Sequence, residues 1–259
     1  GTSSADVWLY LGASVNTATY FGPIVSNTTT WKSTVTGTVY FMIKNSSTSN
    51  GNTIDIDNIS VRLAEEDHST FNNGLQVIGT ITKTAVETGA ELVAYSGFSS
   101  SNYLSQPYND RLNFGTGDFS YTTWFKCTSA GGAQYWFKRG DNTGGNAGLT
   151  VWTAADLQYV AIYINGSGIS TPSGVFELAQ WNQCVISRSN GNITFYINGK
   201  LVMTGYNNFS IPTAQEPALI GYSSGTSSLC LSRIAASSMS AKQVNKMYND
   251  ERSLFATNA

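Results

Sequence analysis

The sequence has 259 residues, with 14 Lys and Arg residues against 16 Asp and Glu residues, which gives a formal net charge of −2. Charged residues make up only 12% of the chain, against ~25% in an average soluble domain, so no basic excess is present to bind a nucleic acid. No stretch reaches the ~18 apolar residues of a membrane span, so no membrane insertion is expected, and the single histidine, His68, leaves little of the usual general-base chemistry.

Stretches rich in Val, Ile, Thr and aromatic residues follow one another along the chain, bounded by clusters of Gly, Asn, Ser or Asp. Such stretches are typical of β-strands. We expect strands over Thr38–Ile43, Thr53–Leu63, Phe119–Cys127, Leu157–Ile164, Gln183–Arg188 and Asn192–Ile197. Their short spacing predicts an all-β sandwich or barrel rather than an α/β sheet.

A domain boundary is expected near Ala64–Asn73, where the charge density rises and the apolar periodicity stops. We therefore divide the chain into a partial β domain over residues 1–64, a linker and connecting strand over 65–88, and a second domain over 89–259. The chain opens on Gly1-Thr2 without a Met. We expect it to be a piece of a longer polypeptide whose first domain lacks its N-terminal strands.

Two Asn-Gly pairs, Asn190-Gly191 and Asn198-Gly199, separate the strand-like runs of the second domain. Asn-Gly supplies the positive φ angles that type I′ hairpin turns require. Residues Gln183–Thr204 are therefore predicted to form a meander of three antiparallel strands.

A helix is expected near the C-terminus. Ser240 and Gln243 have the spacing of a capping box, with Ser240 as the N-cap. Val244, Met247 and Tyr248 then fall on one helical face. We expect about three helical turns packed on the sandwich.

The three cysteines, Cys127, Cys184 and Cys230, each lie in a strand-like run and form no Cys-x-x-Cys motif. We expect buried, unpaired thiols that pack as small apolar side chains. The alternative is one disulfide and one free thiol. Three thiols indicate synthesis in a reducing cytosol.

A Gly-rich segment, residues 140–148, follows the expected strand Gln134–Arg139 and is flanked by aromatic residues. An exposed aromatic ring can stack on a sugar, and Asn side chains can bind its hydroxyl groups. The candidate glycan-binding residues are Tyr135, Trp136, Asn142, Asn146 and Trp152. The alternative is core packing for the rings and turn formation for the loop. Trp124 and Trp181 are expected in the core, because both lie in strand-like runs.

A structural Ca²⁺ is considered at two acidic positions, because carboxylate and amide oxygens are its usual ligands. Asp57 belongs to the alternating run Asp55-Ile56-Asp57, and Asp141 lies in the Gly-rich segment. The alternative is that these carboxylates face solvent.

Motifs for catalysis are missing from the sequence. It contains no Glu-x-Asp-x-Glu strand for glycoside hydrolysis, no Gly-x-Ser-x-Gly elbow and no phosphate-binding loop, because Gly140–Gly148 is not followed by Lys-Ser/Thr. We therefore expect a binding protein rather than an enzyme.

Several motifs of the second domain occur in the order found in a known family. They are Leu112–Tyr121 with Trp124, Trp181 with Val185–Arg188, Phe195–Lys200, Leu229–Ile234 and the helix Ser240–Tyr248. In this order they resemble laminin-G/concanavalin-A-like sandwich domains over residues 90–255. Residues 7–63 resemble the closing half of a carbohydrate-binding-module jelly roll. The resemblance implies an all-β chain: a partial jelly roll, then a concanavalin-A/laminin-G-like β-sandwich (jelly roll) with one short C-terminal helix.

The two domains in this order, with the tail Asn249–Phe255 after the helix, are similar to the distal parts of bacteriophage tail fibres and related virion adhesins. This resemblance implies a non-catalytic, lectin-like receptor-binding protein of the virion tail that binds a host cell-surface glycan, often as a homotrimer. Two alternatives stay open: a polysaccharide lyase or hydrolase on the same sandwich, and a structural virion spacer without a ligand.

Overall fold

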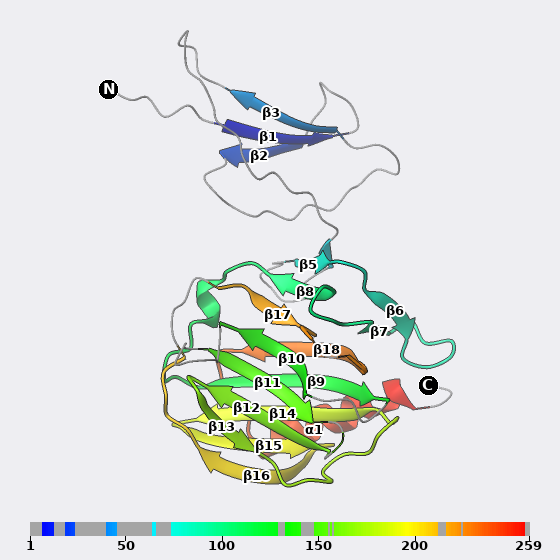
Figure 1. Ribbon diagram of the computed structural model, residues 1–259, viewed down its shortest axis with the longest axis vertical. Coiled ribbons are helices and arrows are strands. Elements are labelled where there is room, and N and C mark those ends of the chain that lie inside the picture. Colours follow the sequence, from blue (N-terminus) through cyan, green and yellow to red (C-terminus); the bar gives the residue numbers. More distant parts are fainter. Residues whose placement is uncertain are drawn as a thin grey trace. The chain divides into compact units, whose positions relative to one another are not determined.

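The computed structural model describes residues 7–12, 19–23, 40–45, 64–65, 74–128, 133–140, 148–154, 156, 158–211, 216–223 and 225–256. The chain divides into two compact units, Gly1–Arg62 and Leu63–Ala259 (Figure 1). Each unit is described by itself.

The first unit contains a three-stranded antiparallel sheet in the order β2-β1-β3. Its strands are β1 (Val7–Gly12), β2 (Thr19–Pro23) and β3 (Tyr40–Asn45). The last of these overlaps the strand predicted over Thr38–Ile43. The strand predicted over Thr53–Leu63 lies outside the described residues, and the partial jelly roll stays a prediction.

The second unit is a sandwich of two antiparallel sheets, which confirms the predicted all-β fold. An eight-stranded sheet has the order β13-β12-β11-β10-β17-β8-β5-β4. Its strands are β4 (Ala64–Glu65), β5 (Leu75–Ile78), β8 (Tyr103–Gln106), β10 (Ala133–Arg139), β11 (Leu149–Ala154), β12 (Tyr159–Ile164), β13 (Ser167–Ser170) and β17 (Ala218–Ile220).

A seven-stranded sheet has the order β16-β15-β14-β9-β18-β7-β6 and forms the second layer. Its strands are β6 (Thr82–Ala85), β7 (Val93–Ser96), β9 (Phe119–Cys127), β14 (Asn182–Ser189), β15 (Asn192–Ile197), β16 (Lys200–Tyr206) and β18 (Ser227–Ala235). Figure 1 shows β10 to β13 in front of β9, β14 and β15, with α1 behind. Residues 65–88, where we expected a linker and a connecting strand, contribute β5 to one sheet and β6 to the other.

The predicted meander is confirmed, because β14 pairs with β15 and β15 with β16. Asn190 and Gly191 adopt φ angles of 49° and 80°, and Asn198 and Gly199 adopt 51° and 75°. These are the positive φ angles that type I′ turns require.

The predicted helix is confirmed as α1 (Ala241–Glu251). The Ser240 hydroxyl accepts from the Gln243 backbone N–H, and the Gln243 side chain accepts from the Ser240 backbone N–H, so the capping box is complete. Val244 packs with Val185 and Tyr196 on the outer face of the seven-stranded sheet. Two short 3₁₀ helices are also present, η1 (Asp110–Leu112) and η2 (Arg252–Phe255).

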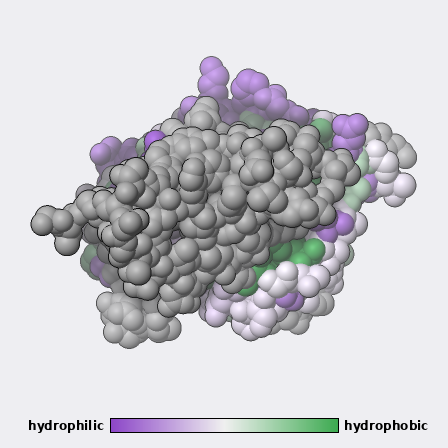
Figure 2. Space-filling view, turned by 90° about the horizontal axis from the view of Figure 1, so that it is seen from above, coloured by the Kyte–Doolittle hydropathy of each residue, from purple (hydrophilic) through white to green (hydrophobic). Residues whose placement is uncertain are grey.

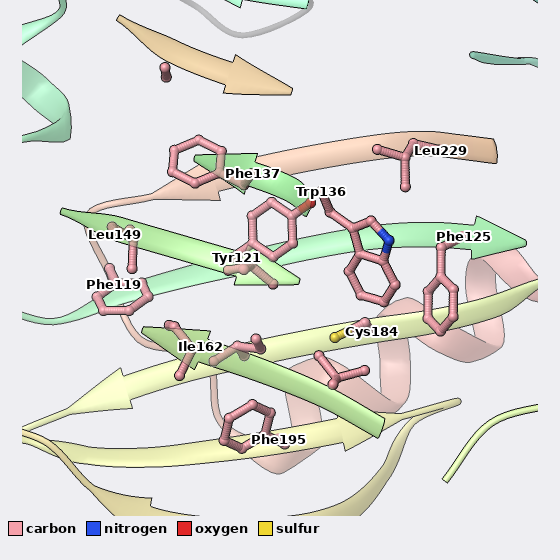
Figure 3. Packing of buried hydrophobic residues seen from close by; sticks show 14 of the residues in the cluster. Phe119, Tyr121, Phe125, Trp136, Phe137, Leu149, Ile162, Cys184, Phe195 and Leu229 are labelled. Atoms are coloured by element: carbon pink, nitrogen blue, oxygen red, sulfur yellow. The ribbon is translucent and has the colours of Figure 1, made fainter. Parts of the chain in front are cut away.

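The main core lies between the two sheets and is built from alternate, inward-facing residues of their strands (Figure 3). In β15, for example, Ile193, Phe195 and Ile197 are all buried. The three cysteines are buried and free, as predicted. Burial raises the pKa of the Cys127 thiol to about 11, so this cysteine is a neutral packing group at pH 7.

On the face seen in Figure 2, the described surface is mostly hydrophilic to neutral, with hydrophobic residues confined to small areas. In the part of the chain that the structure describes, no helix is long and apolar enough to cross a membrane.

Candidate functional site

The outer face of the eight-stranded sheet carries aromatic side chains on three neighbouring strands. In β12, Val160, Ile162 and Ile164 are buried in the core. Because side chains alternate along a strand, Tyr159 and Tyr163 project from the opposite face. Trp152 of β11 and Tyr135 of β10 project from the same face and lie directly opposite each other in the strand register.

These four residues form one cluster of rings, which we call the aromatic face: Tyr135, Trp152, Tyr159 and Tyr163. The Trp152 ring centroid lies 6.3 Å from that of Tyr135, 5.5 Å from that of Tyr159 and 6.1 Å from that of Tyr163. All four residues are half-buried. Packing against one another therefore fixes the rings while part of each stays accessible.

The aromatic face combines flat carbon surfaces with neutral hydroxyl groups. Burial, the nearby phenol of Tyr163 and the carboxylate of Asp156 raise the pKa of Tyr159, so its hydroxyl stays protonated at neutral pH. A neutral phenol can both donate and accept a hydrogen bond. Such an arrangement can stack on the C–H groups of a sugar ring and bind its hydroxyls.

The structure brings together two of the predicted aromatic residues, Tyr135 and Trp152, and corrects the prediction for a third. Trp136 is fully buried in the main core, with its ring centroid 4.2 Å from that of Phe125. The register of β10 shifts between Tyr135 and Phe137, so Trp136 and Phe137 both reach the core. Trp136 is therefore a core residue and cannot stack on a ligand.

The remaining predicted site residues lie outside the described residues. They are the glycan-binding candidates Asn142 and Asn146 and the metal-binding candidates Asp57 and Asp141. Among the residues that are described, no group of three or more His, Cys, Asp or Glu side chains could hold a metal ion.

Sequence reasoning missed Tyr159 and Tyr163 as members of the site. The signal was present in the strand predicted over Leu157–Ile164, because Val160, Ile162 and Ile164 share one face and leave Tyr159 and Tyr163 on the other. A strand with aliphatic residues on one face and tyrosines on the other presents those tyrosines away from the core.

A separate cleft of about 480 Å³ opens on the outer face of the seven-stranded sheet, beside the C-terminal segment. We call it the C-terminal cleft. Trp124 and Trp181, both predicted as core residues, line it. Trp124 is only 2% exposed, which confirms that prediction, whereas Trp181 is half-buried and presents part of its ring to the cleft.

Comparison with known families and structures agrees with this fold. A laminin-G family model, described as the Concanavalin A-like lectin/glucanases superfamily, matches residues 98–244, more than half of the chain. A search of the curated proteins finds no match.

Two solved structures illustrate the likeness. The binding domain of botulinum neurotoxin serotype G has a TM-score of 0.59 and 14% identity, covering 73% of this chain and 49% of that chain. The binding domain of Paraclostridial Mosquitocidal Protein 1 has a TM-score of 0.58 and 15% identity, covering 71% of this chain and 49% of that chain. At these identities the likeness establishes the fold, and this chain spans about half the length of those domains.

Proposed function

Because the chain belongs to the Concanavalin A-like lectin/glucanases superfamily, we propose that its lectin-like sandwich is a non-catalytic receptor-binding domain for a host cell-surface glycan. The observation that carries the proposal is the aromatic face. Its four rings belong to three adjacent strands, so the sheet itself holds them in place. Rigid elements position a binding site better than loops do.

The side chains of this face suit binding more than bond cleavage. The outward residues of β11 and β12 are Thr150, Trp152 and Ala154, then Tyr159, Ala161 and Tyr163. Glycoside hydrolysis requires two carboxyl groups on either side of the scissile bond. Aromatic and hydroxyl side chains instead supply stacking and hydrogen bonds, which hold a sugar without cleaving it.

The biological setting that we propose is the tail fibre of a bacteriophage, with the chain assembled as a homotrimer on the virion. The resemblance to tail-fibre tips supports this setting. A single sugar site of this kind binds weakly. The three linked sites of a trimer would bind a glycan-covered surface more tightly, because the first contact raises the effective concentration for the others. The solved neighbours named above are themselves binding domains of larger proteins, which is consistent with a receptor-binding role.

A glycan array probed with the purified chain and with the variant Trp152→Ala tests the proposal. We expect the wild type to bind a defined subset of glycans and Trp152→Ala to lose about fivefold in affinity, because a stacked aromatic ring contributes about 1 kcal/mol beyond its buried area. Tyr206→Ala is the matched control, because Tyr206 is 66% exposed and lies on the seven-stranded sheet.

Two results would contradict the proposal. Release of new reducing ends, or of unsaturated uronates, from host polysaccharide would show an enzyme. A stable trimer that binds neither glycans nor intact host cells would show a structural spacer.

A structural Ca²⁺ bound through Asp57 or Asp141 remains a separate proposal from the sequence. Carboxylates that share a cation repel one another once it is removed. We therefore expect EDTA to lower the melting temperature and added Ca²⁺ to restore it. An unchanged melting temperature in EDTA would remove calcium from the account.

A further inference from the structure

The C-terminal cleft combines an aromatic surface with charged side chains. Its walls are made by Trp124, Trp181 and Phe255, and the charged side chains of Lys126, Arg252 and Glu87 also line it. The cleft lies on the seven-stranded sheet, whereas the aromatic face lies on the eight-stranded sheet. It is therefore a second place where a ligand could bind.

The aromatic wall is rigid and already has its polar atoms satisfied. Trp124 Nε1 donates to Glu251 Oε2 at 2.7 Å, and Trp181 Nε1 donates to the Val86 carbonyl at 3.2 Å. The Phe255 ring centroid lies 4.1 Å from that of Trp124 and 5.1 Å from that of Trp181. Trp124 is buried between stacked rings, with Tyr248 at 5.8 Å and Phe255 at 4.1 Å, and supports the wall from beneath. The half-buried Trp181 therefore offers a ligand the accessible part of its ring and not its N–H group.

The charges of the cleft are two cations and one anion. Lys126 Nζ lies 5.9 Å from the ring centroid of Trp181, a cation–π distance that holds the ammonium group beside the indole. The nearby carboxylate of Glu251 is already paired with Arg233 at 2.8 Å. Within the described residues, Lys126 and Arg252 form no ion pair, so the cleft has an excess of positive charge on a chain whose net charge is negative.

We propose that the C-terminal cleft binds a saccharide that carries a carboxylate group. The sugar ring stacks on the accessible part of Trp181, and its carboxylate is bound by Lys126 and Arg252. Glu87 and the polar side chains of Gln180 and Ser253, which also line the cleft, bind its hydroxyl groups. A small anion without a sugar ring would make no contact with the Trp181 ring and no hydrogen bond to Glu87, so it would fit the cleft less well. The volume of about 480 Å³ lies within the range of small-ligand sites.

The test compares two probes that differ only in the carboxylate: methyl β-D-glucuronide and methyl β-D-glucoside. The full chain is titrated with each, and the Trp181 indole N–H is followed by ¹H–¹⁵N NMR, its resonance assigned with Trp181→Phe. We expect the glucuronide to bind at least about fivefold more tightly than the glucoside. We expect Lys126→Gln and Arg252→Gln each to raise the dissociation constant of the glucuronide by about fivefold, and added salt to weaken it.

Lys242→Gln is the matched control, because Lys242 is exposed on α1 and does not line the cleft, and it should leave the dissociation constant unchanged. Equal affinity for the two probes, the same shift with sodium acetate, no shift with the glucuronide, or wild-type affinity in both Gln variants would overturn the inference.

The variant Trp152→Ala separates this inference from the proposed function. It should weaken binding at the aromatic face and leave the glucuronide titration unchanged. If Trp152→Ala instead abolishes glucuronide binding and Arg252→Gln does not, the acidic sugar binds at the aromatic face and the cleft is not its site.

Discussion

At the scale of single residues, the buried Arg188 fixes the loop that precedes β9. Its Nε donates to the Gly117 carbonyl at 2.9 Å, and its two terminal nitrogens donate to the carbonyls of Phe209 and Gly115 at 3.0 and 2.7 Å. Burial lowers the pKa of Arg188, but the guanidinium stays charged at neutral pH because its ordinary value is so high. One side chain thereby ties two backbone segments, residues 115–117 and Phe209, to β14 at the rim of the sandwich.

Asp118 extends the same network and predicts how stability depends on pH. Its carboxylate accepts from the Asn190 backbone N–H at 2.9 Å and from the hydroxyls of Ser238 and Ser189. The hydrogen bond from Asn190 is the main cause that lowers the pKa of Asp118 below its ordinary 3.8. The group therefore stabilises the fold above pH 3.8, and this contribution is lost as the pH falls through the lower, folded-state pKa.

The variant Asp118→Asn should accordingly be less stable than the wild type at pH 7, and the difference should shrink toward pH 3. The urea unfolding midpoints of the variant and the wild type, measured from pH 7 to pH 3, test this expectation. Glu216→Gln is the control, since Glu216 is exposed. A difference that stays constant from pH 7 to pH 3 would show that the ionised carboxylate contributes nothing.

Residue-level prediction from the sequence failed at Trp136 for a definite physical reason. Tyr135, Trp136 and Phe137 are consecutive aromatic residues, so alternation alone cannot say which of them face the core. The register shift in β10 decides which of them do, and that shift depends on pairing with β11, whose residues lie farther along the chain and leave no local signal around Trp136. Tyr135 and Trp152, both predicted as glycan-binding residues, lie opposite each other in the register of β10 and β11. Their role in glycan binding stays a prediction.

At the scale of elements, hairpin turns make different demands on glycine. Gly191, between β14 and β15, has a φ angle of 80°, and Gly166, between β12 and β13, has 78°. A Cβ atom at Gly191 would lie 2.8 Å from Cε2 of Tyr206, whereas one at Gly166 would meet no described atom within 4 Å. The two glycines thus share a backbone conformation and differ in their surroundings.

Gly191→Ala should therefore cost more than Gly166→Ala in free energy of unfolding, by about 1 kcal/mol at most, because the exposed Tyr206 ring can shift in part. Both substitutions share the penalty of a side chain in the left-handed region, so comparing them isolates the contact. Chemical denaturation measures both, and Gly191→Ala combined with Tyr206→Ala should reduce the difference. Equal costs for the two single variants would show that Tyr206 moves away freely.

Elements with local signals could be predicted from the sequence, and elements defined by distant pairing could not. The Asn-Gly turns and the capping box depend on residues three or fewer apart, so the meander and α1 were predicted correctly. The short strands β5 and β6 were not placed in the sandwich, because β5 pairs with β8 and β6 with β7. The sequence of β6 (Thr82–Ala85) also gives no strand signal from alternating apolar residues. Its four residues are all exposed in the structure.

At the scale of the whole sandwich, the two sheets separate a core from two outer faces with different chemistry. The aromatic face on the eight-stranded sheet is built from four uncharged rings, with the carboxylate of Asp156 near Tyr159, and the C-terminal cleft on the seven-stranded sheet carries excess positive charge.

The most direct test of the account is to locate the glycan on the molecule. The chain is labelled with ¹⁵N and titrated with a glycan selected on the array, and the shifts of backbone amides and tryptophan indoles are mapped. We predict that the Trp152 indole and the amides of β10, β11 and β12 shift, while the indole of the buried Trp136 does not. Shifts confined to the first unit or to the C-terminal cleft, with Trp152 unmoved, would contradict binding at the aromatic face.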